Sequence, residues 1–219
     1  MECNKYSIQQ GWPIAAALVA LSIIPVAAGV VRLVALARES PSYVANARFL
    51  ANPLPVQLHI VAASLFLVLG ALQFWPGFRR RFPRWHRYLG QMLAPADIVA
   101  GLTGLWMNQF YPYAENDGLL LYLFRWFFGS GMVLAILLGV AAILRRDIAQ
   151  HRIWMMRAYA IGLGAGTQAA TLLPWIWLVG TPSATPRAFL MASAWLFNLA
   201  VAEWFARSPH TAEVSNLHT

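Results

Sequence analysis

Six long apolar segments run through this chain of 219 residues, and short polar or basic turns separate them. A helix needs about 20 consecutive apolar residues to cross the hydrocarbon core of a bilayer. The pattern predicts six transmembrane helices, at residues 12–36, 58–75, 88–108, 119–144, 153–178 and 188–206. We therefore expect an all-α polytopic membrane protein. Because no linker or low-complexity segment divides the chain, residues 1–219 are expected to form a single domain.

The composition agrees with a membrane protein. Hydrophobic residues make up 59% of the chain and charged residues only 11%, whereas a soluble domain carries about 25% charge. Cys3 is the single cysteine, which excludes a disulfide framework and a metal cage of several thiolates. The first apolar segment is too long for a signal peptide and only Lys5 precedes it, so we expect a retained helix.

The basic residues predict the orientation of the chain. The net charge is +8, and most of the arginines lie in short turns between apolar segments. With a cytoplasmic N-terminus, eleven basic residues face the cytoplasm and only Arg38, Arg48 and Arg187 face outward. Positive charge in short loops collects on the cytoplasmic side. We expect a multi-pass membrane protein with both termini in the cytoplasm, and no nucleic-acid partner.

Two basic turns share one motif. Residues 80–87 and 145–152, which lie 65 positions apart, both read R-R-x-x-x-x-H-R. Each turn joins two apolar segments, so helices two and three form one hairpin and helices four and five another. The match predicts parallel repeats and a pseudo-symmetric four-helix core. Pro83 suits the first turn of one helix, and Asp147 suits the N-cap of the other.

The two motif histidines, His86 and His151, suggest a metal-centred cofactor. Equivalent imidazoles on paired helices are a common way to hold the iron of haem b. Arg87, Arg152 and Arg157 are candidates for binding the haem propionates. The alternative is that each histidine meets only lipid headgroups and water at the membrane interface.

Further polar residues fall within the predicted helices. Asp97 is the one carboxylate deep in a segment, and it is expected either to carry a proton or to form a structural hydrogen bond with Thr103, Gln168 or Arg125. His59, Arg125 and Arg32 lie near the predicted outer ends. They suggest an anionic pocket for a quinone headgroup, a porphyrin propionate or a lipid phosphate. Alternatively, the two arginines extend to lipid headgroups.

Several short motifs resemble an uncharacterised family of bacterial membrane proteins, domain of unknown function twenty-three-zero-six. They are His59-Ile60, Gly70-Ala71-Leu72-Gln73-Phe74, His86-Arg87-x-Leu89-Gly90 and His151-Arg152-x-Trp154-Met155-x-Arg157-x-Tyr159-Ala160. The resemblance covers about residues 55–180 and implies an architecture without an activity. A weaker resemblance to b561-type cytochrome cores implies histidine-bound haem, although this chain lacks their full set of four core histidines.

These observations and the family resemblance favour a haem b electron carrier in a bacterial inner (cytoplasmic) membrane. It would exchange electrons with quinone or a redox partner. His86 and His151 would be the axial ligands, and Asp97 would handle a proton. The first alternative is a non-catalytic accessory subunit of a larger respiratory or photosynthetic complex. The second is a small-molecule transporter that uses Asp97 and Arg125.

Overall fold

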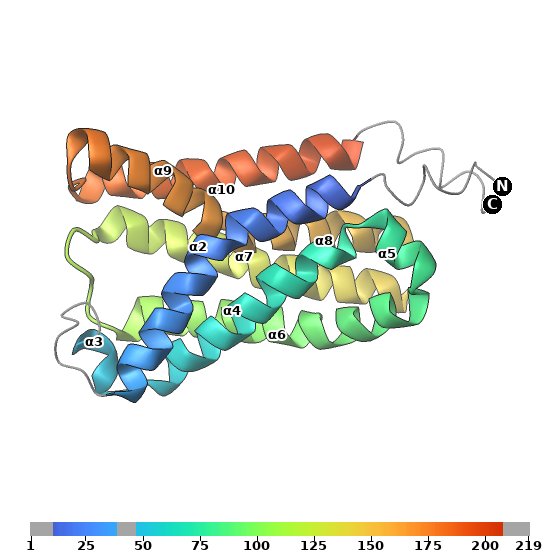
Figure 1. Cartoon of the computed structure of the whole chain (residues 1–219), viewed down its shortest axis with the longest axis horizontal. Coiled ribbons are helices and arrows are strands. Elements are labelled where there is room, and N and C mark those ends of the chain that lie inside the picture. Colours follow the sequence, from blue (N-terminus) through green and yellow to red (C-terminus); the bar gives the residue numbers. More distant parts are fainter. Residues whose placement is uncertain (1–10, 39–46, 208–219) are drawn as a thin grey trace. The chain divides into compact units, whose positions relative to one another are not determined.

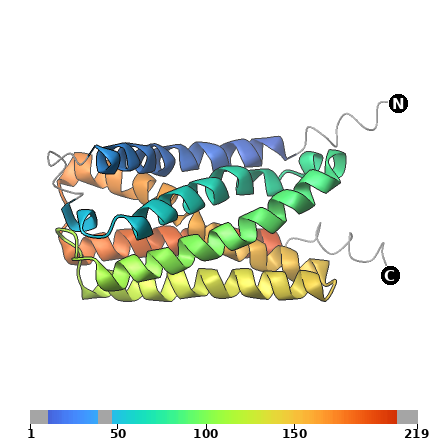
Figure 2. The ribbon, with the colours of Figure 1, turned by 90° about the horizontal axis from the view of Figure 1, so that it is seen from below.

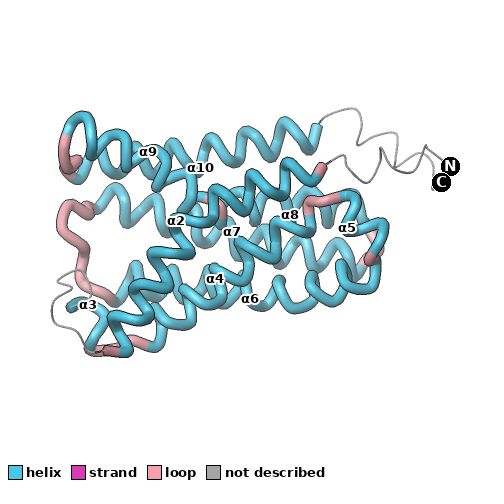
Figure 3. Tube along the Cα trace, in the orientation of Figure 1, coloured by secondary structure: helices cyan, strands magenta, loops and turns pink. Residues whose placement is uncertain are grey.

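The computed structural model describes residues 11–38 and 47–207, and every regular element in these ranges is a helix (Figure 3). The helices are α2 (Trp12–Ala37), α3 (Ala47–Leu50), α4 (Leu54–Gln73), α5 (Pro76–Arg81), α6 (Pro83–Phe110), α7 (Leu119–Leu144), α8 (Ile148–Gly162), α9 (Gly164–Val179) and α10 (Ala184–Arg207). The prediction of an all-α protein is therefore confirmed. Cys3, Lys5, His210, His218 and part of the predicted external loop 37–57 lie outside the described residues.

The chain forms two compact units, residues 1–114 and 115–219. The predicted hairpins belong to different units, the first with α4 and α6 and the second with α7 and α8. The single domain and the four-helix core stay predictions.

In unit 1, α4 packs against both α2 and α6, and Figures 1 and 2 show α6 running alongside α4. Gly29 of α2 permits the first contact, because a Cβ atom there would lie 2.8 Å from Ile60 Cγ2. Only Ala15, Ser22 and Leu36 of α2 are buried. The remaining apolar surface of this helix suits contact with lipid.

An aromatic cluster closes one end of unit 1. Phe49 of α3 meets Tyr111 edge-to-face at 4.9 Å, and the Tyr111 hydroxyl donates to the Asn52 carbonyl at 2.6 Å. The guanidinium carbons of Arg32 and Arg48 lie 5.0 and 4.5 Å from the Phe49 ring centroid. The segment before α4 is thus held against the end of α6 by cation–π and hydrogen-bond contacts.

In unit 2, α7, α8 and α10 pack against one another, and α9 packs against α10. The predicted helix 153–178 is wrong in one respect, because the chain breaks at Leu163 into α8 and α9 (Figure 1). Glycines 162, 164 and 166 weaken helix continuity here. Gly164 also permits a close approach of the Trp195 indole, because a Cβ atom at this position would overlap with Trp195 Nε1. Small residues commonly permit such close packing between membrane helices.

A buried carboxylate ties the start of α7 to α10. Asp117 has a side chain only 2% exposed, and it accepts hydrogen bonds from Arg125 at 2.7 Å and from Arg187 at 3.0 Å. Burial opposes ionisation of Asp117, but the two arginines together outweigh it, and the pKa of Asp117 lies below its ordinary value. The ionised carboxylate therefore stabilises this end of unit 2.

Four helices among the described residues are long and apolar enough to cross a membrane: α2, α4, α7 and α10. These helices imply contact with the lipid bilayer. Helix α6 is less apolar because it contains Gln91, Pro95 and Asp97. Helices α8 and α9 are short because the predicted helix breaks at Leu163. The six predicted spans thus reduce to four candidates here. The observed helices α4, α6 and α10 also begin four or five residues before their predicted starts.

Replacing Gly164 with alanine is expected to destabilise the protein, because the added methyl group collides with the Trp195 indole. Overpacking of this kind costs about 1–3 kcal/mol. Gly131→Ala is the matched control, since the nearest atom to its added Cβ is 4.0 Å away. Thermal unfolding in detergent measures both variants. Equal stability of the two variants would contradict the packing assigned to Gly164.

Asp117→Asn is expected to destabilise the protein near neutral pH by about 1–3 kcal/mol, because charge-assisted hydrogen bonds are lost. The lowered pKa means that this contribution is complete above the ordinary carboxyl value and disappears as the pH falls below about 4. Unfolding measured from pH 7 to pH 3 should show the wild type converging on the variant. Asp147→Asn is the control, because asparagine also caps helices well.

Candidate functional site

The second basic turn places His151 in the first turn of α8. Asp147 caps this helix, since its carboxylate accepts a hydrogen bond from the Gln150 amide at 3.0 Å, and the predicted N-cap is confirmed. The His151 amide donates to the Asp147 carbonyl at 3.0 Å. His151 is therefore the fourth residue after the cap, and its backbone is held by the start of the helix.

The His151 imidazole is bound to the backbone of the neighbouring helix α7. Its Nδ1 atom lies 2.9 Å from the Gly139 carbonyl oxygen. Because a carbonyl oxygen only accepts hydrogen bonds, Nδ1 carries the proton. In the neutral form of such a ring the lone pair is on Nε2, which is the arrangement of a metal-binding histidine. Gly139 allows the close approach, since a Cβ there would lie 2.8 Å from Met155 Sδ.

His86 occupies the corresponding position in unit 1. Its amide donates to the carbonyl of the N-cap residue Phe82 at 3.0 Å, and Pro83 lies in the first turn of α6 as predicted. The His86 side chain is half-buried. The two turns differ elsewhere: α5 precedes α6, whereas Arg146 in the second turn has a φ of 63°. The two turns are therefore structurally equivalent only at the start of the helix, from the N-cap residue to the histidine.

His59 is held in the same way as His151. Its Nδ1 atom lies 2.8 Å from the Ala100 carbonyl oxygen of α6, so Nδ1 again carries the proton and Nε2 the lone pair. The Thr103 hydroxyl lies 3.4 Å from the same Nδ1. Gly104 faces the ring, and a Cβ there would lie 3.2 Å from His59 Cε1. No short-range motif in the sequence indicates this bond between two helices.

The arginines predicted to hold propionates have different surroundings. Arg87 and Arg152, each next to a motif histidine, are exposed. Arg157 instead forms a two-point ion pair with Glu203 of α10, at 2.5 and 3.2 Å, and its guanidinium carbon lies 4.4 Å from the Trp154 ring centroid. No local sequence pattern indicates this role of Glu203, because Arg157 and Glu203 lie 46 positions apart in the chain.

The pocket predicted from His59, Arg32 and Arg125 is divided between the two units. Arg32 lies over Phe49 in unit 1, whereas Arg125 of unit 2 pairs with Asp117. This pocket and its anionic ligands stay predictions.

Asp97 of α6 is the most deeply buried acidic residue of the described chain, with 1% of its surface exposed. Neither carboxyl oxygen has a hydrogen-bond partner among the described residues. The partners suggested by the sequence bond elsewhere: the Thr103 hydroxyl donates to the Val99 carbonyl, and the Gln168 amide donates to the Met191 carbonyl. The predicted structural hydrogen bond of Asp97 is therefore not formed with these two residues.

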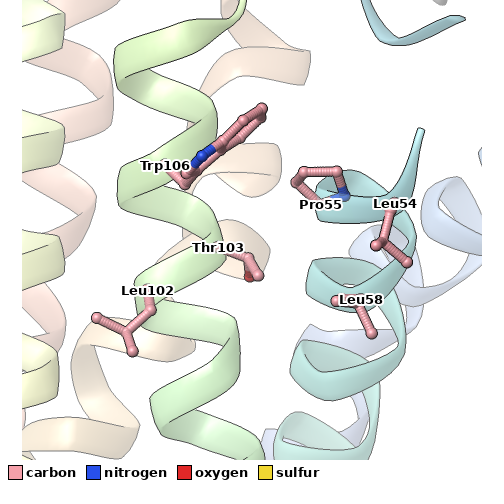
Figure 4. A pocket seen from close by; sticks show the side chains of 6 residues that line it. All are labelled: Leu54, Pro55, Leu58, Leu102, Thr103 and Trp106. Atoms are coloured by element: carbon pink, nitrogen blue, oxygen red, sulfur yellow. The ribbon is translucent and has the colours of Figure 1, made fainter. Parts of the chain in front are cut away.

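A shallow apolar groove of about 240 Å³ lies between α4 and α6 (Figure 4). Its lining consists of Leu54, Pro55, Leu58, Leu102, Thr103 and Trp106. The Thr103 hydroxyl already donates to its own helix, so this lining offers little to a polar or charged ligand. A lipid chain matches its chemistry.

Residues 11–38 and 47–207 contain no cluster of three or more His, Cys, Asp and Glu side chains suited to a metal ion. This finding does not bear on a haem, whose porphyrin supplies four ligands and whose protein ligands are one or two side chains.

Comparison with known proteins gives one match. The model of a family described as "Predicted membrane protein (DUF2306)" matches residues 56–206. No curated protein and no solved structure matches the chain, so the resemblance to b561-type cytochromes gains no support. The family match extends past the region that the motifs indicated and confirms the predicted membership. The chain therefore belongs to the family of predicted membrane proteins DUF2306.

Proposed function

We propose that this protein carries electrons within the membrane by means of haem b, with His151 as an axial ligand. The single observation that carries the proposal is the bond from His151 Nδ1 to the Gly139 carbonyl. Ligand histidines in proteins commonly donate their second ring N–H to a carbonyl or carboxylate, which fixes the tautomer and the ring orientation. His151 has this second partner in place.

The position of His151 on two helices supports the same role. Its backbone is fixed by the Asp147 cap of α8, and its ring is fixed by the backbone of α7. The α7–α8 contact at Gly139 and Met155 is close, so the carbonyl has little freedom to move away. A side chain supported on two rigid elements would hold its position beside a bound haem.

We propose His86 as an axial ligand on independent grounds. It follows its N-cap by the same four residues as His151 and belongs to the same repeated motif. The exposed arginines Arg87 and Arg152 are the propionate partners in this proposal, because Arg157 is engaged by Glu203. Spectroscopy of single-histidine variants decides whether one iron takes both rings.

Electron exchange with quinone or a redox partner, the bacterial inner membrane and the cytoplasmic position of both termini are parts of the same proposal. The cytoplasmic position of the termini rests on the distribution of basic residues in the sequence.

The proposal predicts that the protein purified from cells supplied with haem precursor has the absorbance spectrum of a low-spin haem b. His151→Ala is expected to lose most of the bound haem, because the iron loses an axial ligand. His86→Ala is expected to lower the haem content as well, because His86 is the second proposed axial ligand. Absorbance in the Soret region, measured per mole of protein, reads out each variant.

His210→Ala is the control, since it removes a histidine outside the described helices. His59→Ala tests whether haem binding is specific to the motif histidines. The His59 ring is hydrogen-bonded to a backbone carbonyl as His151 is, but His59 lies outside the repeated motif. Colourless wild-type protein, or an unchanged spectrum in His151→Ala, would refute the haem proposal. The accessory subunit and the transporter stay predictions, and co-purification in mild detergent tests the former.

A further inference from the structure

Two contacts define how α4 and α6 run past each other. Gly104 of α6 faces the His59 ring, and Gly90, about four helical turns earlier in the chain, faces Gln73. Both contacts fit one antiparallel register, because 14 residues separate the two positions on each helix. The same register places Phe66 of α4 at the level of Asp97, halfway between the two contacts. Asp97 thus lies at the middle of the hairpin.

Apolar side chains of the hairpin lie near the level of Asp97. Phe66 and Leu67 of α4 and Leu93 and Ala100 of α6 are all buried. Pro95 lies in the same helix and withdraws one backbone N–H from this turn. The described residues therefore provide no hydrogen-bond donor to either oxygen of Asp97.

Ionisable groups on the packed helices are remote along the helix axis. His59 of α4 is seven residues from the level of Asp97, which is about 10 Å at 1.5 Å per residue. On α6 the nearest are Arg87, His86 and Arg84, ten or more residues away or about 15 Å. The α5 residues Arg79, Arg80 and Arg81 lie beyond that end of α6. None of these groups is bonded to Asp97.

An ionised carboxylate without a donor or a counter-ion is strongly disfavoured in such a place, whereas a carboxylic acid is neutral and retains only one O–H to satisfy. We propose that Asp97 is a protonated carboxylic acid at the centre of the α4–α6 hairpin, and that it forms a proton-exchange site within the membrane. In the exchange, the carboxyl O–H bond breaks, the proton passes to water, and a proton from water re-forms the bond. This proposal is independent of haem.

Infrared spectroscopy of the full chain in lipid nanodiscs tests the proposal at neutral pH. We expect a carbonyl-stretch band of a protonated carboxyl group in the wild type, and we expect Asp97→Asn to lose it. Asp147→Asn is the matched control, because it removes the exposed capping aspartate and should leave the band unchanged. In heavy water the band should shift while the amide bands of the helices still show undeuterated backbone, because exchange occurs in the folded protein.

A second measurement needs only the wild-type protein, and it therefore tests the proposal even if Asp97→Asn does not fold. Wild-type protein labelled with carboxyl-¹³C aspartate should show the same band displaced by the isotope, which assigns it to an aspartic acid. Absence of a protonated-carboxyl band from the wild type overturns the proposal, as does its persistence in a folded Asp97→Asn variant. A band that never shifts in heavy water overturns the exchange and leaves a purely structural acid.

Discussion

The hydrogen bond from a histidine side chain to the backbone carbonyl of a neighbouring helix is the interaction on which the site depends. His151 makes this bond to Gly139 and His59 makes it to Ala100. In both hairpins a glycine lies at the contact, because a Cβ atom would keep the helices apart. The bond has two consequences: it holds the ring in place, and it determines which ring nitrogen has the lone pair. In each hairpin, therefore, the close helix contact that contains a glycine also orients a histidine ring.

The two units differ in how their buried or partly buried charged side chains are paired. In unit 2 the partly buried arginines are neutralised by carboxylates, Arg125 by Asp117 and Arg157 by Glu203. The Arg157–Glu203 pair joins α8 to α10, and Asp117 also binds Arg187 of α10. These ion pairs reduce the positive charge that is available to a bound anion. In unit 1 the buried carboxylate of Asp97 has no such partner among the described residues. A buried acid without a partner, in a protein whose other buried acid is paired, is a candidate for a functional role such as proton exchange rather than for a structural role.

The repeated motif shows how much a short sequence match can predict. Pro83 in the first turn of α6 and Asp147 as the N-cap of α8 were predicted correctly, because caps and first turns depend on a few adjacent residues. The predicted bounds, 88–108 and 153–178, nevertheless began five residues after the observed starts of α6 and α8. The equal spacing from cap to histidine follows from the same local rules. The segments before the caps differ, with a short helix in one turn and a left-handed residue in the other. The match therefore supports equivalent histidines more strongly than it supports identical hairpins.

The all-helical architecture, the membrane character and the approximate helix positions followed from the sequence alone, because bilayer thickness and backbone hydrogen bonding leave few other choices to long apolar segments. The family membership followed from short motifs. Tertiary structure decided the rest: the break at Leu163, the Glu203 partner of Arg157, and the tautomers of His59 and His151. Each of these depends on side chains or carbonyls from helices far apart in the chain, and helical periodicity within one segment does not specify which atoms of another segment will lie beside it.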